Sequence, residues 1–164
     1  MKKFSTFKFK HLRVFEQDEQ NNIQTIEPQQ PDMQNTEVSG ASKFFSKLFE
    51  SREMAHVYHL SVKGDMGSYA AHVALGSYYD SILGQIDSLI ETYQGQYGLV
   101  ENFEIINTAD TKTKEPIAYF EELVEFVKTE RHTCLKDEDT HLQNMVDEVI
   151  ALIYQTLYKL KFNK

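Results

Sequence analysis

Two histidines and two acidic residues in the middle of the chain have the side chains and the spacing to bind a transition metal. His59 and His72 lie thirteen residues apart. Asp87 follows His72 by fifteen residues, and Glu91 comes four residues later. Imidazole nitrogens and carboxylate oxygens both suit iron and zinc. The sequence therefore gives four candidate metal ligands: His59, His72, Asp87 and Glu91.

The spacing of these ligands predicts that one chain cannot build the site alone. On a helix that rises about 1.5 Å per residue, His72 and Asp87 lie roughly 22 Å apart, so one ion cannot touch both. Two antiparallel copies of the helix, related by a two-fold axis near Asp80, would bring His72 of one copy to Asp87 and Glu91 of the other. We therefore expect a homo-oligomer, at least a dimer, with a metal site between subunits.

The acids of this helix share a face with His72. With His72 at zero, the helical-wheel angles are about 60° for Asp87, 80° for Asp80 and 100° for Glu91. Asp80 is thus an additional candidate ligand. The same pattern would arise from a solvated acidic stripe on an ordinary amphipathic helix, and this alternative stays open.

His56 is a second additional candidate ligand, one helical turn before His59. A histidine on the inner side of a helix is more often a hydrogen-bonded core residue, so both interpretations remain. Glu53 and His56 match a Glu-x-x-His pair, which di-iron bundles use twice. The last helical segment holds no second copy, which argues against a metal site inside one subunit.

The elements that would position these residues are helices. Apolar residues recur at helical spacing over four segments, 43–63, 68–94, 116–134 and 139–162. A long connection, 95–116, separates the second segment from the third. The pattern predicts an all-α four-helix bundle, residues 43–164, with one long central crossover.

Residues 1–42 predict a polar and basic N-terminal tail with a disordered or extended linker. Its cationic residues are Lys2, Lys3, Lys8, Lys10 and Arg13. These contribute +5 to a net charge of -8, so the rest of the chain, including the acids of residues 16–42, carries -8 - 5 = -13. An acidic body repels nucleic acid, and only this tail could bind DNA. Docking to a larger assembly and simple solubilisation are the alternatives.

Several segments resemble the Dps proteins, which are ferritin-like proteins that store iron. The segment from His59 to Gly64, His-Leu-Ser-Val-Lys-Gly, is similar to their His-Trp-Asn-Val-Lys-Gly motif. Asp87-x-x-x-Glu91 is similar to their Asp-x-x-x-Glu motif, and the resemblance covers roughly residues 43–162. Residues 71–80 and 91–98 look more closely like Dps-related proteins of tailed bacteriophages.

This resemblance implies a ferritin-like bundle that binds iron, with zinc as the alternative, between the subunits of an oligomer or cage. It also implies a ferroxidase activity that is weak or lost, because Gly76 stands where Dps proteins carry an acid. Leu60 replaces their tryptophan, and one extra residue separates the two histidines. The alternative is a structural or interaction module of a phage virion or another large assembly, docked through the N-terminal tail, without metal chemistry.

Other kinds of chemistry are poorly supported by the sequence. Cys134 is the single cysteine, so no internal disulfide can form. His132 and Cys134 are two residues apart and would face away from each other on a helix. There is no phosphate-binding glycine loop, no apolar run long enough for a membrane span and no secretory signal. We therefore expect a cytoplasmic or virion-associated protein that does not enter a membrane.

Overall fold

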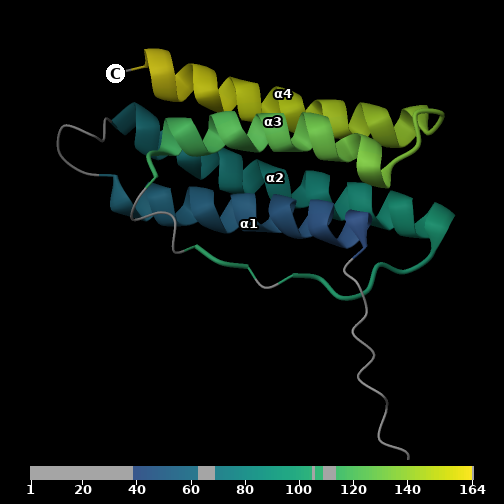
Figure 1. The fold of residues 1–164 in the computed structure, drawn as a ribbon. Helices are drawn as coiled ribbons and strands as arrows, with labels where there is room; N and C mark the ends of the chain where they lie inside the picture. Colours follow the sequence, from purple (N-terminus) through teal and green to yellow (C-terminus); the bar gives the residue numbers. More distant parts are fainter. Residues whose placement is uncertain (1–38, 63–68, 105, 109–113, 164) are drawn as a thin grey trace, which may run out of the picture. The chain divides into compact units, whose positions relative to one another are not determined.

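Four helices make up the part of the chain that the structure, a computed structural model, describes: residues 39–62, 69–104, 106–108 and 114–163. They are α1 (Gly40–Ser61), α2 (Tyr69–Tyr97), α3 (Pro116–Cys134) and α4 (Thr140–Phe162), as Figure 1 shows. This confirms the predicted all-α four-helix bundle. The predicted basic tail and the helix start at Ser68 lie outside the described residues.

The path of the crossover fixes the direction of each helix. The described parts of the crossover contact α1 near both of its ends. Ser42 Oγ donates to Asn102 O at 2.6 Å and Glu104 N donates to Ser46 Oγ at 2.8 Å, whereas Tyr58 Oη, near the end of α1, donates to Lys114 O at 2.8 Å. The helix α3 therefore starts beside the end of α1 and runs parallel to α2. The order is up, down, down, up, the layout of bundles with one long crossover.

Each helix packs against two neighbours around a single core. The helix α1 packs against α2 and α3, and α4 packs against the same two helices. The largest fully buried side chains come from all four helices: Tyr78, Phe44, Phe45, Phe120, Leu48, Met54, Leu75, Ile82, Ile86, Leu89, Leu123 and Leu142. None of the described helices combines the length and the apolar character that crossing a membrane requires.

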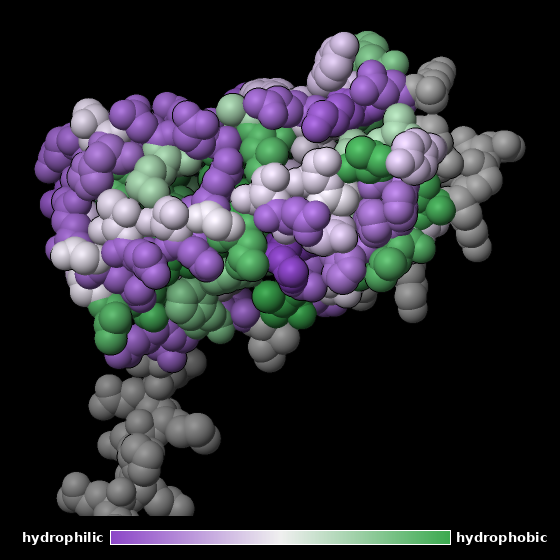
Figure 2. Space-filling model, turned by 180° about the vertical axis from the view of Figure 1, so that it is seen from behind, coloured by the Kyte–Doolittle hydropathy of each residue, from purple (hydrophilic) through white to green (hydrophobic). Residues whose placement is uncertain are grey.

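Two apolar residues of α2 are on the surface rather than in the core. Val73 is 44% exposed and Leu83 is 39% exposed. Each lies next to a buried residue, Ala74 or Ile82, and successive positions on a helix are about 100° apart. The inward stripe of α2 is therefore narrower than its apolar composition suggests. Figure 2 shows the rear face of the bundle, where small apolar patches alternate with polar side chains.

The helix ends follow local chemistry. The helix α1 begins at Gly40, three residues earlier than expected, because the hydroxyl of Ser39 accepts a hydrogen bond from Ser42 N at 3.1 Å. The helix α2 continues past Gly95, where we expected it to end. It stops before Gly98, whose φ of 89° is open to glycine but strained for other residues. A single glycine inside a helix weakens it without ending it.

Asp139 stands at the N-cap position of α4, but its side chain makes no capping hydrogen bond and has other partners. Its carboxylate accepts hydrogen bonds from the hydroxyl of Tyr97 and from Gln96 Nε2, the latter at 2.8 Å. These contacts tie the end of α2 to the turn between α3 and α4. The hydrogen bond from Tyr97 is the largest cause that lowers the pKa of Asp139, and it raises the pKa of Tyr97 to about 12.

This contact predicts a pH dependence of stability with two limbs. Asp139 has a lowered pKa in the folded state, so its contribution is present above about pH 4 and is lost as the pH falls. Tyr97 has a raised pKa, so its contribution is present below about pH 10 and is lost as the pH rises toward 12. Urea unfolding from pH 3 to 11 should show that Tyr97→Phe lowers the free energy of unfolding near neutral pH and flattens both limbs. Tyr158→Phe, which removes an exposed hydroxyl, serves as control; equal curves for both variants would contradict the prediction.

Candidate metal centre

The end of α1 and the start of α2 bring His59 and His72 into direct contact. These two helices form an antiparallel hairpin, so residues thirteen apart in sequence lie side by side. The imidazole rings are stacked, with centroids 3.7 Å apart and planes inclined by 25°. Both side chains are partly buried. The structure therefore joins the two predicted histidine ligands within one chain.

Reciprocal hydrogen bonds hold this pair and define its protonation pattern. His59 Nδ1 bonds to His72 O at 2.8 Å, and His72 Nδ1 bonds to His59 O at 3.1 Å. A carbonyl oxygen only accepts, so each Nδ1 must carry the hydrogen. In the neutral ring the lone pair then lies on Nε2, and no described residue forms a hydrogen bond with either Nε2. This is the arrangement of histidines that bind metals through Nε2.

Gly76 lies directly beneath the ring of His59. A Cβ atom at this position would be 3.3 Å from both Cε1 and Nδ1 of His59, tighter than most contacts of real Cβ atoms. Dps proteins, which the sequence resembles, carry an acidic side chain at this position. Here the ring of His59 fills the space that such a side chain would need. An aspartate or glutamate at position 76 would have to displace His59 before it could act as a ligand.

His56 extends the aromatic cluster along α1. The centroid of its ring lies 4.7 Å from that of Tyr79 and 6.5 Å from that of His59. The ring centroids of Tyr79 and His59 are 5.3 Å apart. His56 is partly exposed, so it borders the His59–His72 pair without being a fully buried core residue. Tyr79 was not among the candidates from sequence, because a tyrosine at helical spacing is ordinarily a packing residue.

The acidic candidates do not join the histidines within the chain. Asp80, Asp87 and Glu91 are exposed on α2, and helix geometry places Asp87 roughly 22 Å from His72. Within the described ranges, no three His, Cys, Asp or Glu side chains are grouped closely enough to hold a metal ion. One chain thus places the two candidate histidine ligands together beside the start of α2, and the two candidate carboxylates in the second half of that helix.

The interior of the bundle is built for packing. Tyr78 and Phe120 meet edge to face at its centre, with ring centroids 4.7 Å apart. The hydroxyl of Tyr78 bonds to Ser51 Oγ at 2.8 Å, and burial raises the pKa of this tyrosine. Among the described residues, Asp139 is the one buried carboxylate, and it lies before α4 rather than inside the bundle. A carboxylate-bridged site at the bundle centre has no ligands in this part of the chain.

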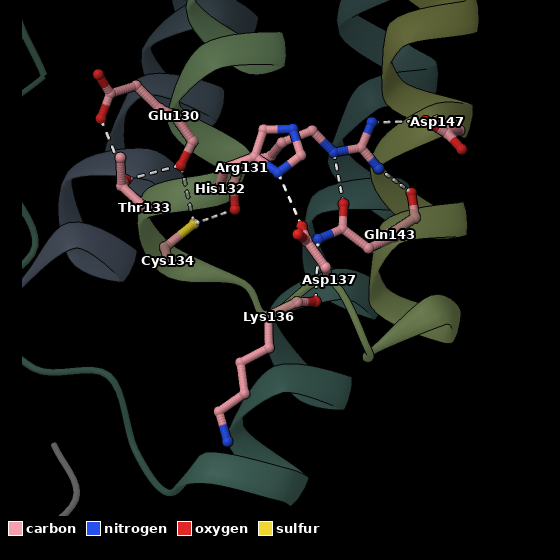
Figure 3. Close-up of polar contacts among 9 residues, drawn as sticks. All are labelled: Glu130, Arg131, His132, Thr133, Cys134, Lys136, Asp137, Gln143 and Asp147. Atoms are coloured by element: carbon pink, nitrogen blue, oxygen red, sulfur yellow. Dashed lines mark hydrogen bonds and ion pairs between the residues drawn. The ribbon is translucent and has the colours of Figure 1, made fainter.

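His132 and Cys134 turn toward different partners at the end of α3, as Figure 3 shows. His132 Nδ1 lies 3.0 Å from Asp137 Oδ1, whereas Cys134 Sγ points to the carbonyls of Glu130 and Arg131 at 3.5 and 3.7 Å. Burial raises the pKa of Cys134 to about 12, which keeps the thiol protonated at neutral pH. This geometry does not suit a Cys–His nucleophile.

Arg131 occupies the same region and joins α3 to α4 (Figure 3). Its Nε and Nη2 donate to the side chain and the carbonyl of Gln143 at 2.6 and 2.7 Å, and its Nη1 reaches Asp147 Oδ1 at 2.6 Å. Charge-assisted bonds of this kind are among the stronger polar contacts in proteins. The polar residues at this end of the bundle therefore have structural partners.

The comparisons with known proteins place the chain in a family. The profile of a family of unknown function matches residues 59–160 of the 164 residues. The chain belongs to this family, DUF5856. The DUF5856 region contains His59, His72, Asp87 and Glu91, and it begins at the first of them. No curated protein and no solved structure shows significant similarity to the chain.

Proposed function

We propose that two copies of this DUF5856 protein bind transition-metal ions, iron or zinc, at sites shared between their α2 helices. The observation that carries the proposal is the His59–His72 pair. Two adjacent imidazoles hold their protons on Nδ1 and leave both Nε2 atoms without a partner among the described residues. This arrangement requires further ligands from a second chain, because the acids of the same chain are too far away.

Helix geometry supplies those ligands in an antiparallel pair. If the two-fold axis crosses α2 midway between Asp80 and Leu83, residue 72 of one chain lies level with residue 91 of the other. Gly76 is then level with Asp87 of the partner subunit. The exposed carboxylates of one chain would approach the histidines of the other at Gly76, where α2 carries no side chain to block them. The exposed Val73 and Leu83 would be covered in the same contact.

The donor set fits the proposed metals. His59 and His72 would contribute two neutral nitrogens, and Asp87 and Glu91 of the partner subunit would contribute two carboxylates. This mixture suits Fe(II) and Zn(II) by ligand type. Iron bound there would bring redox chemistry with oxygen or peroxide. We expect that chemistry to be weak, since position 76 provides no acid to bridge a second ion.

The test measures metal binding and assembly on the same sample. Metal-free full-length protein is titrated with Zn(II), and separately with Fe(II) without oxygen, while sedimentation velocity reports its mass. We expect a dimer or larger species, tightened by metal, with two ions per dimer. A monomer at micromolar concentration that still binds metal would contradict the shared site.

An interaction module without metal chemistry is the second candidate function. The observation that favours it is the contact at Gly76, where the ring of His59 fills the place of a bridging acid. In this case the histidine pair serves to pack the α1–α2 hairpin, and partners would be bound through the N-terminal tail. The absence of any metal binding in the titration would favour this candidate.

A further inference from the structure

We infer that Gly76 is a positioning residue: by lacking a side chain it lets the ring of His59 lie across α2, stack on His72 and keep its Nε2 atom available as a metal ligand. Glycine has no side chain that could bind a metal or ionise. The role of Gly76 follows from the ring of His59, which lies against it. The value of this arrangement for metal binding rests on the proposed function, whereas the arrangement itself does not.

The contact at Gly76 involves the atom that holds the pair together. His59 Nδ1 is one of the two atoms that a Cβ at position 76 would approach at 3.3 Å, and the same atom bonds to His72 O at 2.8 Å. The ring cannot retreat from a new methyl group without weakening this bond. A shift of the His59 ring would also disturb its stacking on the ring of His72, because the two ring centroids are only 3.7 Å apart.

A second glycine in α2 provides a matched control. Gly95 also lies within the helix, and a Cβ added there would meet no atom within 4 Å. Alanine is more favourable than glycine inside a helix, so both Gly→Ala substitutions gain intrinsic helix preference, and the gain is smaller at Gly95 because it lies in the last turn of α2. A change in the histidine signals with Gly76→Ala that is absent with Gly95→Ala then reports the effect on His59.

The tautomers of the two histidines can be measured on metal-free protein. Two-dimensional nitrogen–proton NMR of the imidazole rings above pH 7.5 should show Nδ1 protonated in both His59 and His72 of the wild type. Gly95→Ala should leave these signals unchanged, and Gly76→Ala should convert both rings to a mixture of tautomers. Protonated Nε2 in the wild type, or unchanged signals in Gly76→Ala, would overturn the inference.

A double substitution keeps the test valid if Gly76→Ala folds poorly. In a His59→Ala background the ring is gone, so adding Gly76→Ala should raise the melting temperature as Gly95→Ala does in the wild type. In the wild-type background, Gly76→Ala should raise it less or lower it. Equal gains in both backgrounds would show that the ring does not press on position 76.

Zinc titration tests whether the position of the His59 ring affects metal affinity. Gly76→Ala should weaken Zn(II) affinity by about tenfold or more, the effect typical of residues that orient a ligand, while Gly95→Ala binds as the wild type does. Normal tautomers with no zinc binding in any variant would refute the proposed function and leave the positioning role intact. Zinc affinity that is equal in all three proteins would refute the role of Gly76 in the site.

Discussion

His59→Ala and Asp87→Ala are each expected to abolish most metal binding, with a loss in affinity of about 100-fold or more. Each substitution removes one of only four proposed ligands, and even the residues that merely orient ligands contribute about 10- to 100-fold in known metal sites. His59 lies at the end of α1, beside the start of α2, whereas Asp87 lies in the second half of α2. Equal losses would therefore connect parts of the molecule that do not meet in one chain. Isothermal titration with Zn(II), and anaerobic titration with Fe(II), measure the effect.

His132→Ala is the matched control for this prediction. Its imidazole is exposed and bonds to Asp137 at the other end of the bundle from the His59–His72 pair. Metal affinity should be unchanged. If His132→Ala reduces binding as much as His59→Ala does, the metal is held by scattered surface histidines and the proposed site is wrong.

Phe120→Ala is expected to lower the free energy of unfolding by about 3 to 5 kcal/mol. Its ring is fully buried and packs edge to face on Tyr78 and Tyr119, so its loss leaves a cavity that the surrounding helices cannot easily fill. Urea denaturation followed by circular dichroism gives the free energy. A marginally stable protein of this size would lose a large part of its total stability.

Tyr158→Ala removes an aromatic ring of similar size from the surface. Tyr158 is 60% exposed, and its ring contacts Phe162, which is 69% exposed. We expect a change within about 0.5 kcal/mol. Similar losses for Phe120→Ala and Tyr158→Ala would mean that the aromatic core is not packed as described.

The number of helices, their order and the long crossover could be predicted from sequence, because apolar periodicity is a strong signal over twenty or more residues. The helix ends could not be placed with the same precision. Gly95 and Gly98 are both plausible endings, and only the backbone conformation shows that the helix passes through the first and stops before the second. The outward position of Val73 and Leu83 depends on how the neighbouring helices sit, which periodicity does not determine.

The candidate site was predicted as a set of residue types, and its geometry was not. His59 and His72 were chosen for their chemistry, but their stacking and reciprocal bonds depend on the exact register between α1 and α2. Gly76 was interpreted as a lost acid. The structure shows instead that it accommodates a ring, which a sequence pattern cannot reveal because the two residues are seventeen positions apart. Whether Asp87 and Glu91 complete the site depends on a second chain.

A complementation experiment tests the shared site most directly. His72→Ala and Asp87→Ala proteins are prepared separately, each expected to bind little metal, and then mixed under conditions that let subunits exchange. In a mixed dimer one of the two sites combines His72 from one chain with Asp87 from the other and is intact. Random exchange makes about half of the dimers mixed, so zinc bound at saturation should recover to about one quarter of the wild-type amount. No recovery after verified exchange would contradict a metal site built from two copies of this chain.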